Sequence, residues 1–454
     1  DMYITKDKLE KILYDCGITG YSDIFVSCEY GTTKTGSLFK EFKNKVDGTS
    51  YLHIGDNYEA DILAAEKHGI DSFRIFSACH MLGVSKWRDI LKSDGEYVSR
   101  VMIGLFVSHV FNSPFALFNT NGKICINDSF DAAWLFIAPL VSTFIHWLLR
   151  KLAGSNYDKI LFFARDGFLV EQLYRMAIER EVETRLPESR YFLTSRVACL
   201  VATIFEEKDI LKIISMGFDG PPEMLLEKRF LLERKDIVAY RSDCYESIEE
   251  YILSHKSKIL ATAEQNRAGY KKYIEIENIM PTDKLAVFDL AASGTCQCCL
   301  HELIPNEIDG FYFVYIKSND DKMRSLDISS LYKIDSWFKK EAFICESYIL
   351  MESVLTSFEG SLEGFDINGE PRFANEYFDT EHSYQILLMQ QAIKEYFCEY
   401  LPLIARSKPT IDTADKLLSF IQNRYTDITR LPIFNDSLHD GFYNRSYCFR
   451  DVLE

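Results

Sequence analysis

Two segments in the first 78 residues space their apolar positions as helices do, and three others are short apolar runs. The helical spacing lies at 6–16 and 58–68. The short apolar runs, typical of strands, lie at 24–26, 51–54 and 73–76. Gly17 and Gly69 follow the two helical segments, where glycine commonly ends a helix. Strands and helices in alternation predict a parallel, Rossmann-like α/β arrangement over residues 1–85.

A second alternating pattern occupies the middle of the chain. Strands are predicted at 159–164, 190–196, 285–290 and 310–316. A helix at 169–180 follows the first of them, and residues 197–280 have the pattern of helices with charged faces. We therefore expect a second Rossmann-like α/β domain over 156–330, with a helical insertion at 197–280.

The remaining segments are mainly helical in pattern. Residues 86–155 are expected to form a helical connector, and 331–454 a mostly helical C-terminal region with one hairpin turning at Asn368-Gly369. Two uncharged runs, 101–122 and 132–149, are long enough to cross a membrane. Both contain proline and several polar residues, so we expect buried helices and no membrane span.

Composition narrows the classes of function. The 454 residues include 51 Lys and Arg against 68 Asp and Glu, a net charge of −17 with no basic block, which argues against nucleic-acid binding. The 12 cysteines are scattered, as in reduced cytoplasmic proteins. The one cluster, Cys296, Cys298 and Cys299, lacks the spaced pairs of a zinc site, so we expect an ordinary junction between loop and helix there.

Chemistry is first suggested by Gly55-Asp56-Asn57, directly after a predicted strand, and by Asp61 five positions after Asp56. Two carboxylates at the carboxyl end of a parallel strand can hold Mg²⁺. The alternative is that both only cap the helix that follows. Lys34, in a short glycine-bounded loop upstream, favours the first interpretation, because a lysine there can neutralise a phosphate.

Together, the lysine loop and the Gly-Asp motif resemble motifs III and IV of the haloacid-dehalogenase-like (HAD) superfamily. The resemblance implies a magnesium-dependent phosphohydrolase in which Lys34 stabilises an aspartyl-phosphate, Asp56 binds Mg²⁺ and Asp61 supports the metal or its waters. The family's Asp-x-Asp nucleophile motif and its Ser/Thr motif have no match. The opening Asp1-Met2-Tyr3 resembles the segment that follows the hydroxyl motif, so we expect an N-terminally truncated domain that does not turn over.

The wider chain resembles a group of predicted bacterial HAD hydrolases associated with cell-surface polysaccharide synthesis. Its landmarks are the opening residues, Gly55-Asp56-Asn57, Ala138-Pro139, residues 163–167, Thr194-Ser195-Arg196, Asp289 and Ser293-Gly294-Thr295. This resemblance implies a phosphorylated small molecule, such as a sugar phosphate, as the substrate.

The second α/β domain admits two interpretations. Residues 163–167 have the form of the HAD nucleophile motif, with Ala164 at the nucleophile position and Asp166 at that of the acid/base. A degenerate domain of this kind would bind without hydrolysing. Alternatively, residues 289–295 resemble a phosphoribosyltransferase loop, although only Asp289 precedes the small residues where such loops usually carry two acids.

Both interpretations predict an anion site. Backbone amides of Ser293, Gly294 and Thr295 would lie at a helix N-terminus, which attracts phosphate. Arg165 and Arg196, at the ends of predicted strands, can pair with a phosphate or carboxylate.

Three functions and one structural alternative stay open from the sequence. The first is the magnesium-dependent phosphohydrolase. The second is a binding or scaffold module that holds a phosphosugar for a partner such as a glycosyltransferase. The third is a transferase acting on a ribosyl diphosphate. In the structural alternative, Arg165 and Asp289 only form a salt bridge.

Overall fold

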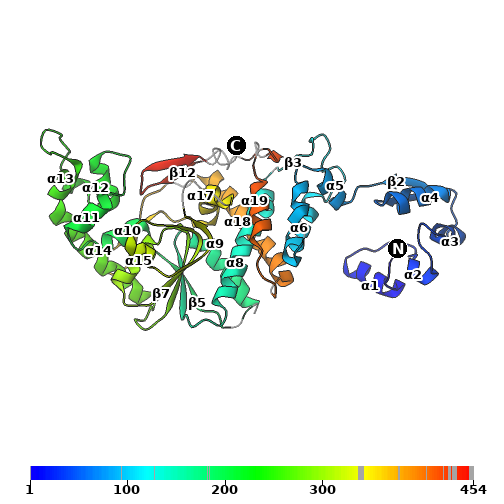
Figure 1. The fold of residues 1–454 in the computed structure, drawn as a ribbon, viewed down its shortest axis with the longest axis horizontal. Coiled ribbons are helices and arrows are strands. Elements are labelled where there is room, and N and C mark those ends of the chain that lie inside the picture. The colour runs from blue at the N-terminus through cyan, green and yellow to red at the C-terminus, as the bar shows by residue number, and fades with distance from the viewer. Residues whose placement is uncertain are drawn as a thin grey trace. The chain divides into compact units, whose positions relative to one another are not determined.

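The computed structural model describes residues 2–93, 95–126, 128–180, 183, 185–335, 342–376, 379–404, 406–422, 424–427, 431 and 437–448. It is a mixed α/β protein, as the pattern of the sequence predicts. The chain divides into two compact units (Figure 1). Unit 1 comprises residues 1–88 and 107–122, and unit 2 comprises residues 89–106 and 123–454.

Unit 1 is built around two parallel strands. Its elements are α1 (Lys6–Asp15), α2 (Ser27–Tyr30), α3 (Leu38–Lys45), β1 (Leu52–Gly55), η1 (Tyr58–Leu63), α4 (Ala64–Lys67), β2 (Asp71–Arg74) and α5 (Ala78–Val84). β1 pairs with β2. The prediction of a strand at 24–26 is wrong, since this short run pairs with no strand in the described chain and instead leads into α2.

One face of the β1–β2 sheet is apolar and exposed. Side chains alternate across a strand, so His53 and Gly55 face the helices while Leu52, Ile54 and Phe73 face outward. These three are 62%, 55% and 56% exposed. Parallel sheets are ordinarily covered on both faces, so this surface is unusual.

Unit 2 contains the predicted second α/β domain. Its sheet consists of β4 (Lys159–Phe163), β5 (Glu188–Phe192), β6 (Leu285–Ala292), β7 (Ile308–Ile316) and β8 (Ile328–Ile334). All five strands are parallel, in the order β5-β4-β6-β7-β8. The four predicted strands are present, but the one predicted at 190–196 lies at 188–192, because Ser195 caps α10 and Arg196 begins that helix. The fifth runs across the boundary that we placed at residue 330, because its apolar residues are interrupted by Ser329-Ser330 and Lys333 and give no continuous signal.

Helices cover both faces of this sheet (Figure 1). On one face lie α10 (Arg196–Ala202), α14 (Lys256–Ile276) and α15 (Thr295–Leu303). On the other lie α8 (Ala138–Leu152), α9 (Gly167–Glu179) and α17 (Ile344–Leu355). Strand side chains alternate accordingly. Leu161 and Phe163 pack with the first group, while Phe162 packs on Tyr174 of α9.

The apolar run at 132–149 is a core helix. It belongs to α7 (Ser129–Ala132), η3 (Ala133–Ile137) and α8, a continuous stretch long and apolar enough to cross a membrane, yet 94% of its most apolar window is buried in the structure. The run at 101–122 is not one helix, because α6 (Tyr97–Val110) ends within it.

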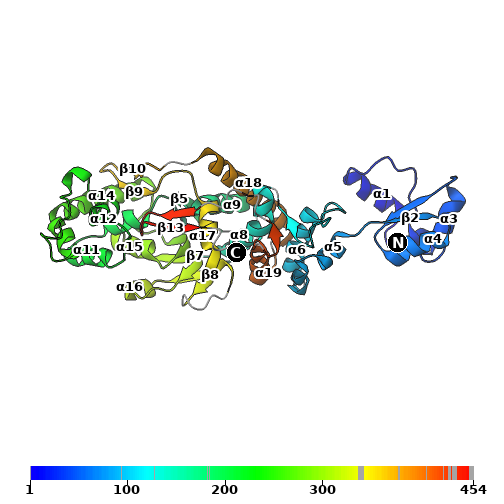
Figure 2. The same ribbon diagram turned by 90° about the horizontal axis from the view of Figure 1, so that it is seen from above.

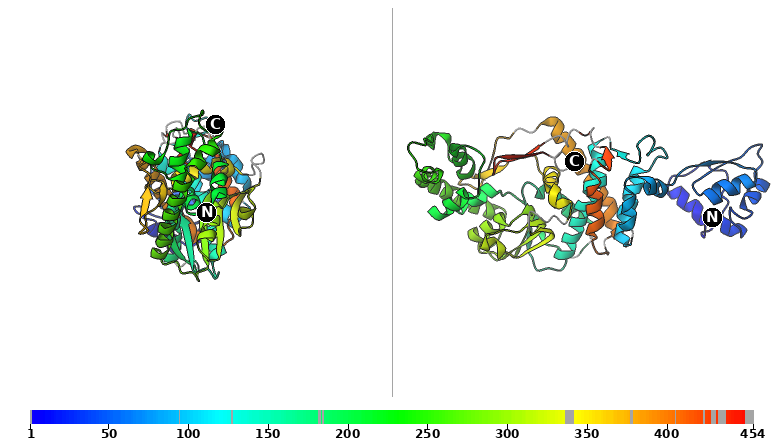
Figure 3. Two further views of the ribbon diagram at one scale, coloured as in Figure 1. Left: turned by 90° about the vertical axis from the view of Figure 1, so that its left-hand side faces the viewer. Right: turned by 45° about the horizontal axis from the view of Figure 1, so that its top comes forward.

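The helical insertion and the C-terminal segment complete unit 2. The insertion adds α11 (Glu207–Ile214), α12 (Pro222–Phe230), η4 (Arg234–Asp236) and α13 (Ile248–Ser254), which lie with α14 at one end of this unit (green in Figure 3). The other elements are η2 (Arg88–Ser93), β3 (Ile124–Cys125), α16 (Asp321–Arg324), β9 (Leu362–Phe365), β10 (Pro371–Phe373), α18 (Thr380–Ile404), α19 (Ile411–Ser419), β11 (Thr426–Asp427), β12 (Ser437–Asp440) and β13 (Arg445–Cys448).

The C-terminal region is less helical than expected. The predicted hairpin is confirmed as β9–β10, with Gly369 at positive φ in its turn. A second hairpin, β12–β13, lies beside α17 (Figures 1 and 2). Its strands are short and mostly polar, so their sequence carries little strand signal. This hairpin brings the end of the described chain to the carboxyl edge of the large sheet.

Candidate functional site

In unit 1, the predicted motif residues meet at the carboxylate of Asp61, which is 3% exposed. Lys34 forms an ion pair with Asp61 Oδ1, and His53 Nε2 lies 3.1 Å from the same oxygen. The backbone N–H of Asn57 donates to Oδ2 at 2.9 Å. Lys34 and Asp61, 27 positions apart, are therefore brought together, and His53 supports the same carboxylate.

This network determines the charge of Asp61. Burial alone raises the pKa of the carboxyl, but the hydrogen bonds from Lys34, His53 and Asn57 outweigh it and hold the pKa at about 2. Gly55 is needed for the same packing, because a Cβ there would overlap the Asp61 carboxyl. The Gly-Asp motif thus builds a buried carboxylate whose oxygens are already occupied by donors.

The other two motif residues have different roles. Asn57 caps η1, since its Oδ1 accepts from the N–H groups of Glu59 and Ala60 at 3.1 and 3.0 Å. Asp56 is exposed, and its backbone oxygen accepts from Arg74 Nε at 3.3 Å. In the described parts of the chain, no three His, Cys, Asp or Glu side chains could together hold a metal. With Asp61 occupied, these residues do not form a magnesium site on their own, and Mg²⁺ at Asp56 and Asp61 stays a prediction.

In unit 2, the strand order determines where a ligand would bind. The chain winds from β4 outward to β5, then returns past β4 to β6. The loops after β4 and β6 therefore diverge, and such switch points are where open α/β sheets bind ligands. The loop after β4 carries Arg165 and Asp166, while Asp289 lies near the end of β6. Arg196 begins α10, after the neighbouring strand β5.

We call Arg165, Asp166, Arg196, Asp289, Glu352 and Asp440 the switch-point site, since their side chains interact electrostatically there. The predicted Arg165–Asp289 salt bridge is not formed. Arg165 instead pairs with Glu376 Oε2 at 2.9 Å and donates to the backbone oxygen of Glu359 at 3.4 Å. The Arg165 side chain extends toward the β9–β10 hairpin, and therefore it does not pair with Asp289.

Arg196 is the central cation of the switch-point site. Its Nη1 is buried and has no hydrogen-bond partner among the described residues, the nearest acid being Asp440 Oδ2 at 3.9 Å. Its guanidinium lies 4.8 and 5.3 Å from the ring centres of Phe442 and Tyr443. These aromatic contacts fix the side chain while leaving a buried donor available to a ligand.

Burial raises the pKa of three acids of the site, Asp166, Asp289 and Glu352. Burial, with a smaller contribution from Glu352, raises the pKa of Asp289 to about 7 against the opposing effect of Arg196. Burial and the carboxyls of Glu352 and Asp289 raise the pKa of Asp166 well above its usual value. Burial and Asp440 likewise raise that of Glu352. The site therefore carries less negative charge near neutral pH than its composition suggests.

Helix α15 presents its N-terminus beside these groups. Gly294, at φ 96°, is its N-cap and offers no side chain. Within the described chain, no acceptor pairs with the backbone N–H groups of Thr295, Cys296 or Gln297. The hydroxyls of Ser293 and Thr295 lie 3.9 Å from the sulfur of Met323, so only their backbone groups are suited to the predicted anion site.

Two residues of the site escaped the sequence analysis because they come from remote segments. Glu352 lies on α17, where an acid within an apolar helix was the only available signal. Asp440 ends β12. Arg229 positions the adjoining turn, since its buried guanidinium donates to the backbone oxygens of Phe442 at 2.9 Å and Ile213 at 3.1 Å.

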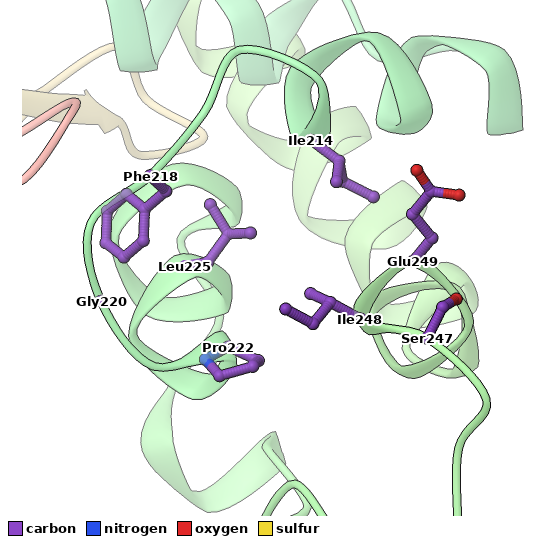
Figure 4. Close-up of a pocket in the computed structure, with 8 residues that line it drawn as sticks. All are labelled: Ile214, Phe218, Gly220, Pro222, Leu225, Ser247, Ile248 and Glu249. Carbon is purple, nitrogen blue, oxygen red and sulfur yellow. The ribbon is translucent and has the colours of Figure 1, made fainter. Parts of the chain in front are cut away.

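An apolar pocket of about 480 Å³ lies elsewhere, in the helical insertion (Figure 4). Ile214, Leu225 and Ile248 point toward one another there, from α11, α12 and α13. Glu249 supplies the only charged side chain in its lining. None of the predicted site residues lines it, and it lacks the converging polar groups expected of a specific ligand site.

Replacing Asp61 with Asn tests the unit 1 network. The lowered pKa means that the ionised carboxyl stabilises unit 1 at pH values above about 4, and this contribution is lost as the pH falls toward 2. We expect the variant to lose about 2 kcal/mol at pH 7 and about half that at pH 3. Hydrogen exchange of peptides covering β1 and η1 measures this, with the exposed Asp71→Asn as the control. An equal loss at both pH values would contradict the ionic origin.

Replacing Asp289 with Asn tests the raised pKa. A carboxyl that ionises at about 7 in the folded state but near 4 in the unfolded state costs stability as the pH rises between these values. Asp289→Asn is expected to be more stable than the parent at pH 8, by on the order of 1–4 kcal/mol, and the gain should vanish near pH 4. Thermal unfolding across this range measures the difference. The exposed Asp243→Asn should show no such trend, and destabilisation by Asp289→Asn at every pH would refute the assignment.

A comparison with models of known protein families and with curated proteins finds no match to this chain. The resemblance to the HAD superfamily therefore stays a prediction, and functional assignment depends on the geometry described above.

Proposed function

We propose that unit 2 binds a phosphorylated small molecule at the switch-point site. Two observations carry this proposal. Arg196 Nη1 is buried and has no hydrogen-bond partner among the residues that the structure describes, and the first-turn amides of α15 have no acceptor there either. Amides at a helix N-terminus and a guanidinium are the two groups that proteins use most readily for phosphate. The interactions of Arg196 with both Asp289 and Cys296 support their closeness.

The remainder of the ligand is proposed to be rich in hydroxyl groups, as in a sugar phosphate. Asp166, Asp289 and Glu352 offer several carboxyl oxygens at the same strand ends. Carboxyl groups accept hydrogen bonds from hydroxyls, and in their protonated form they donate as well. Asp289, with a pKa of about 7, is also suited to move a proton at neutral pH, which leaves room for catalysis.

The alternative ribosyl-diphosphate transferase has weaker support. Its resemblance requires acids before the small residues of the loop, and Asp289 stands alone there. A glycosyltransferase as the partner stays a prediction from the resemblance. For the location of the protein we propose the cytoplasm, because all 12 cysteines are free thiols.

A second proposal concerns unit 1. The contact between Lys34 and Asp61 supports a HAD-like phosphohydrolase half-site at the carboxyl end of β1. In the HAD superfamily, which these motifs resemble, the corresponding residues act on a phosphoryl group that is carried by an aspartate and bound to magnesium. Lys34 would neutralise the phosphoryl charge, while Asp61 holds the lysine in place.

Calorimetric titration of the protein with glucose 1-phosphate, with inorganic phosphate and with glucose tests the first proposal. We expect the parent protein to bind the sugar phosphate most tightly, and Arg196→Ala to weaken that binding at least about tenfold, since it removes a charge-assisted hydrogen bond. Arg196→Lys should recover part of the affinity, because it keeps the charge but not the fork of donors. Arg190→Ala, on neighbouring β5, is the matched control. Equal affinities for the parent and Arg196→Ala would disprove phosphate binding here.

Hydrolysis of p-nitrophenyl phosphate with added Mg²⁺ tests the second proposal. The matched motifs lack the aspartate nucleophile, so the chain is expected to show no turnover above that of its Asp56→Asn variant. Turnover that disappears in Asp56→Asn would mean that the half-site is complete without the missing motif. In that case the proposed division of the site would be wrong.

A further inference from the structure

Three cysteine thiols meet between α10 and α15. Cys199 comes from α10, and Cys296 and Cys299 lie one turn apart on α15. Cys199 Sγ lies 4.0 Å from the backbone oxygen of Cys296, and the thiols of Cys296 and Cys299 both interact with that of Cys199. Thr203 Oγ1 bonds to Cys299 Sγ at 3.5 Å and to the backbone oxygen of Cys199 at 3.0 Å, which ties the two helices together at this point.

The three thiols differ in their access to solvent. Cys199 is fully buried and Cys299 is 6% exposed. Cys296 is partly exposed, and it borders the switch-point site through its interaction with Asp289. Cys296 is therefore the more accessible of the two cysteines, and Cys199 is the more buried.

The Cys199 sulfur also lies within hydrogen-bonding distance of two hydroxyl groups. Thr194 Oγ1 lies 3.0 Å and Tyr270 Oη 3.5 Å from its sulfur. Burial by itself raises the pKa of this thiol, but the bonds from Cys296, Cys299, Thr194 and Tyr270 outweigh it and lower the pKa well below its ordinary value.

We propose that Cys199 and Cys296 form a redox-modification site that takes a peroxide as its oxidant. The Cys296 thiol is oxidised by hydrogen peroxide to a sulfenic acid, with release of one water. The Cys199 sulfur then attacks the Cys296 sulfur, the S–O bond breaks, and hydroxide leaves as a second water after taking a proton. The two thiols lose two electrons to the peroxide, and one disulfide forms.

This disulfide would join the first turn of α10, in which Cys199 lies three positions after Arg196, to the first turn of α15. The inference goes beyond the proposed function and does not depend on it, since the thiols lie together whether or not a phosphate binds. Metal binding is the competing use of such a cluster. Among the residues that the structure describes, no His, Cys, Asp or Glu group is arranged to hold a metal, so the oxidation is favoured.

Peptide mapping after oxidation tests the proposal. Trypsin cuts after Arg196, Lys208, Lys284 and Lys317. Cys199 is therefore the only cysteine in peptide 197–208, whereas peptide 285–317 contains Cys296, Cys298 and Cys299. The full chain is treated with equimolar hydrogen peroxide, remaining thiols are alkylated, and the digest is analysed by mass spectrometry. We expect these two peptides to be linked, and dithiothreitol to release them.

Single variants identify the partner of Cys199. Cys296→Ser should abolish the link, whereas Cys299→Ser should retain it. Cys298→Ser is the matched control, because its side chain interacts with Glu302 and Lys322, away from Cys199. Circular dichroism shows that each variant is folded before it is scored.

Several results would overturn the proposal. One is a link that survives Cys296→Ser but is lost in Cys299→Ser, which would make Cys299 the partner. Another is alkylation of Cys199 and Cys296 to the same extent with and without peroxide. A third is stoichiometric zinc in the purified protein, released only when these cysteines are modified, which would make the cluster a metal site.

Discussion

A five-stranded parallel sheet of apolar strands buries both of its faces, and this constraint organises unit 2. Every strand of β5-β4-β6-β7-β8 runs the same way, so the chain must leave the sheet after each strand and return along one of its faces. Because winding reverses between β4 and β6, two loops separate at the carboxyl edge. Arg165, Asp166 and Asp289 meet there because of this topology, and α17 and the β12–β13 hairpin reach the same edge with Glu352 and Asp440.

Raised pKa values of buried acids allow an acidic protein to bind the proposed anionic ligand. The chain carries −17 overall, and the switch-point site has more acids than bases. The pKa of about 7 leaves Asp289 partly protonated near neutral pH, and the pKa values of Asp166 and Glu352 are raised as well, so the field of Arg196 and the α15 N-terminus is opposed by less negative charge. Unit 1 uses the opposite solution, in which Lys34 and His53 keep Asp61 ionised.

The sequence predicts only those residues of the switch-point site that directly follow a recognisable strand. Strand ends are visible as apolar runs that stop, which is why Arg165, Arg196 and Asp289 were identified. Glu352 and Asp440 lie far away in the chain, and only the fold brings them in. The same holds for Lys34 and Asp61, whose proximity was suggested by a resemblance and not by spacing. The backbone amides of Ser293, Gly294 and Thr295 were expected at the anion site from the local pattern, but the contacts of the Ser293 and Thr295 hydroxyls with the Met323 sulfur depend on the fold.

The uncovered face of the β1–β2 sheet bears on how this protein behaves in solution. Leu52, Ile54 and Phe73 form an apolar surface on a sheet with only two strands, whose edges are open to pairing. Surfaces of this kind promote self-association as concentration rises. The colloidal behaviour of the whole chain would then be governed by its smaller unit, while the larger one, with its sheet covered on both faces, sets the cooperativity of unfolding.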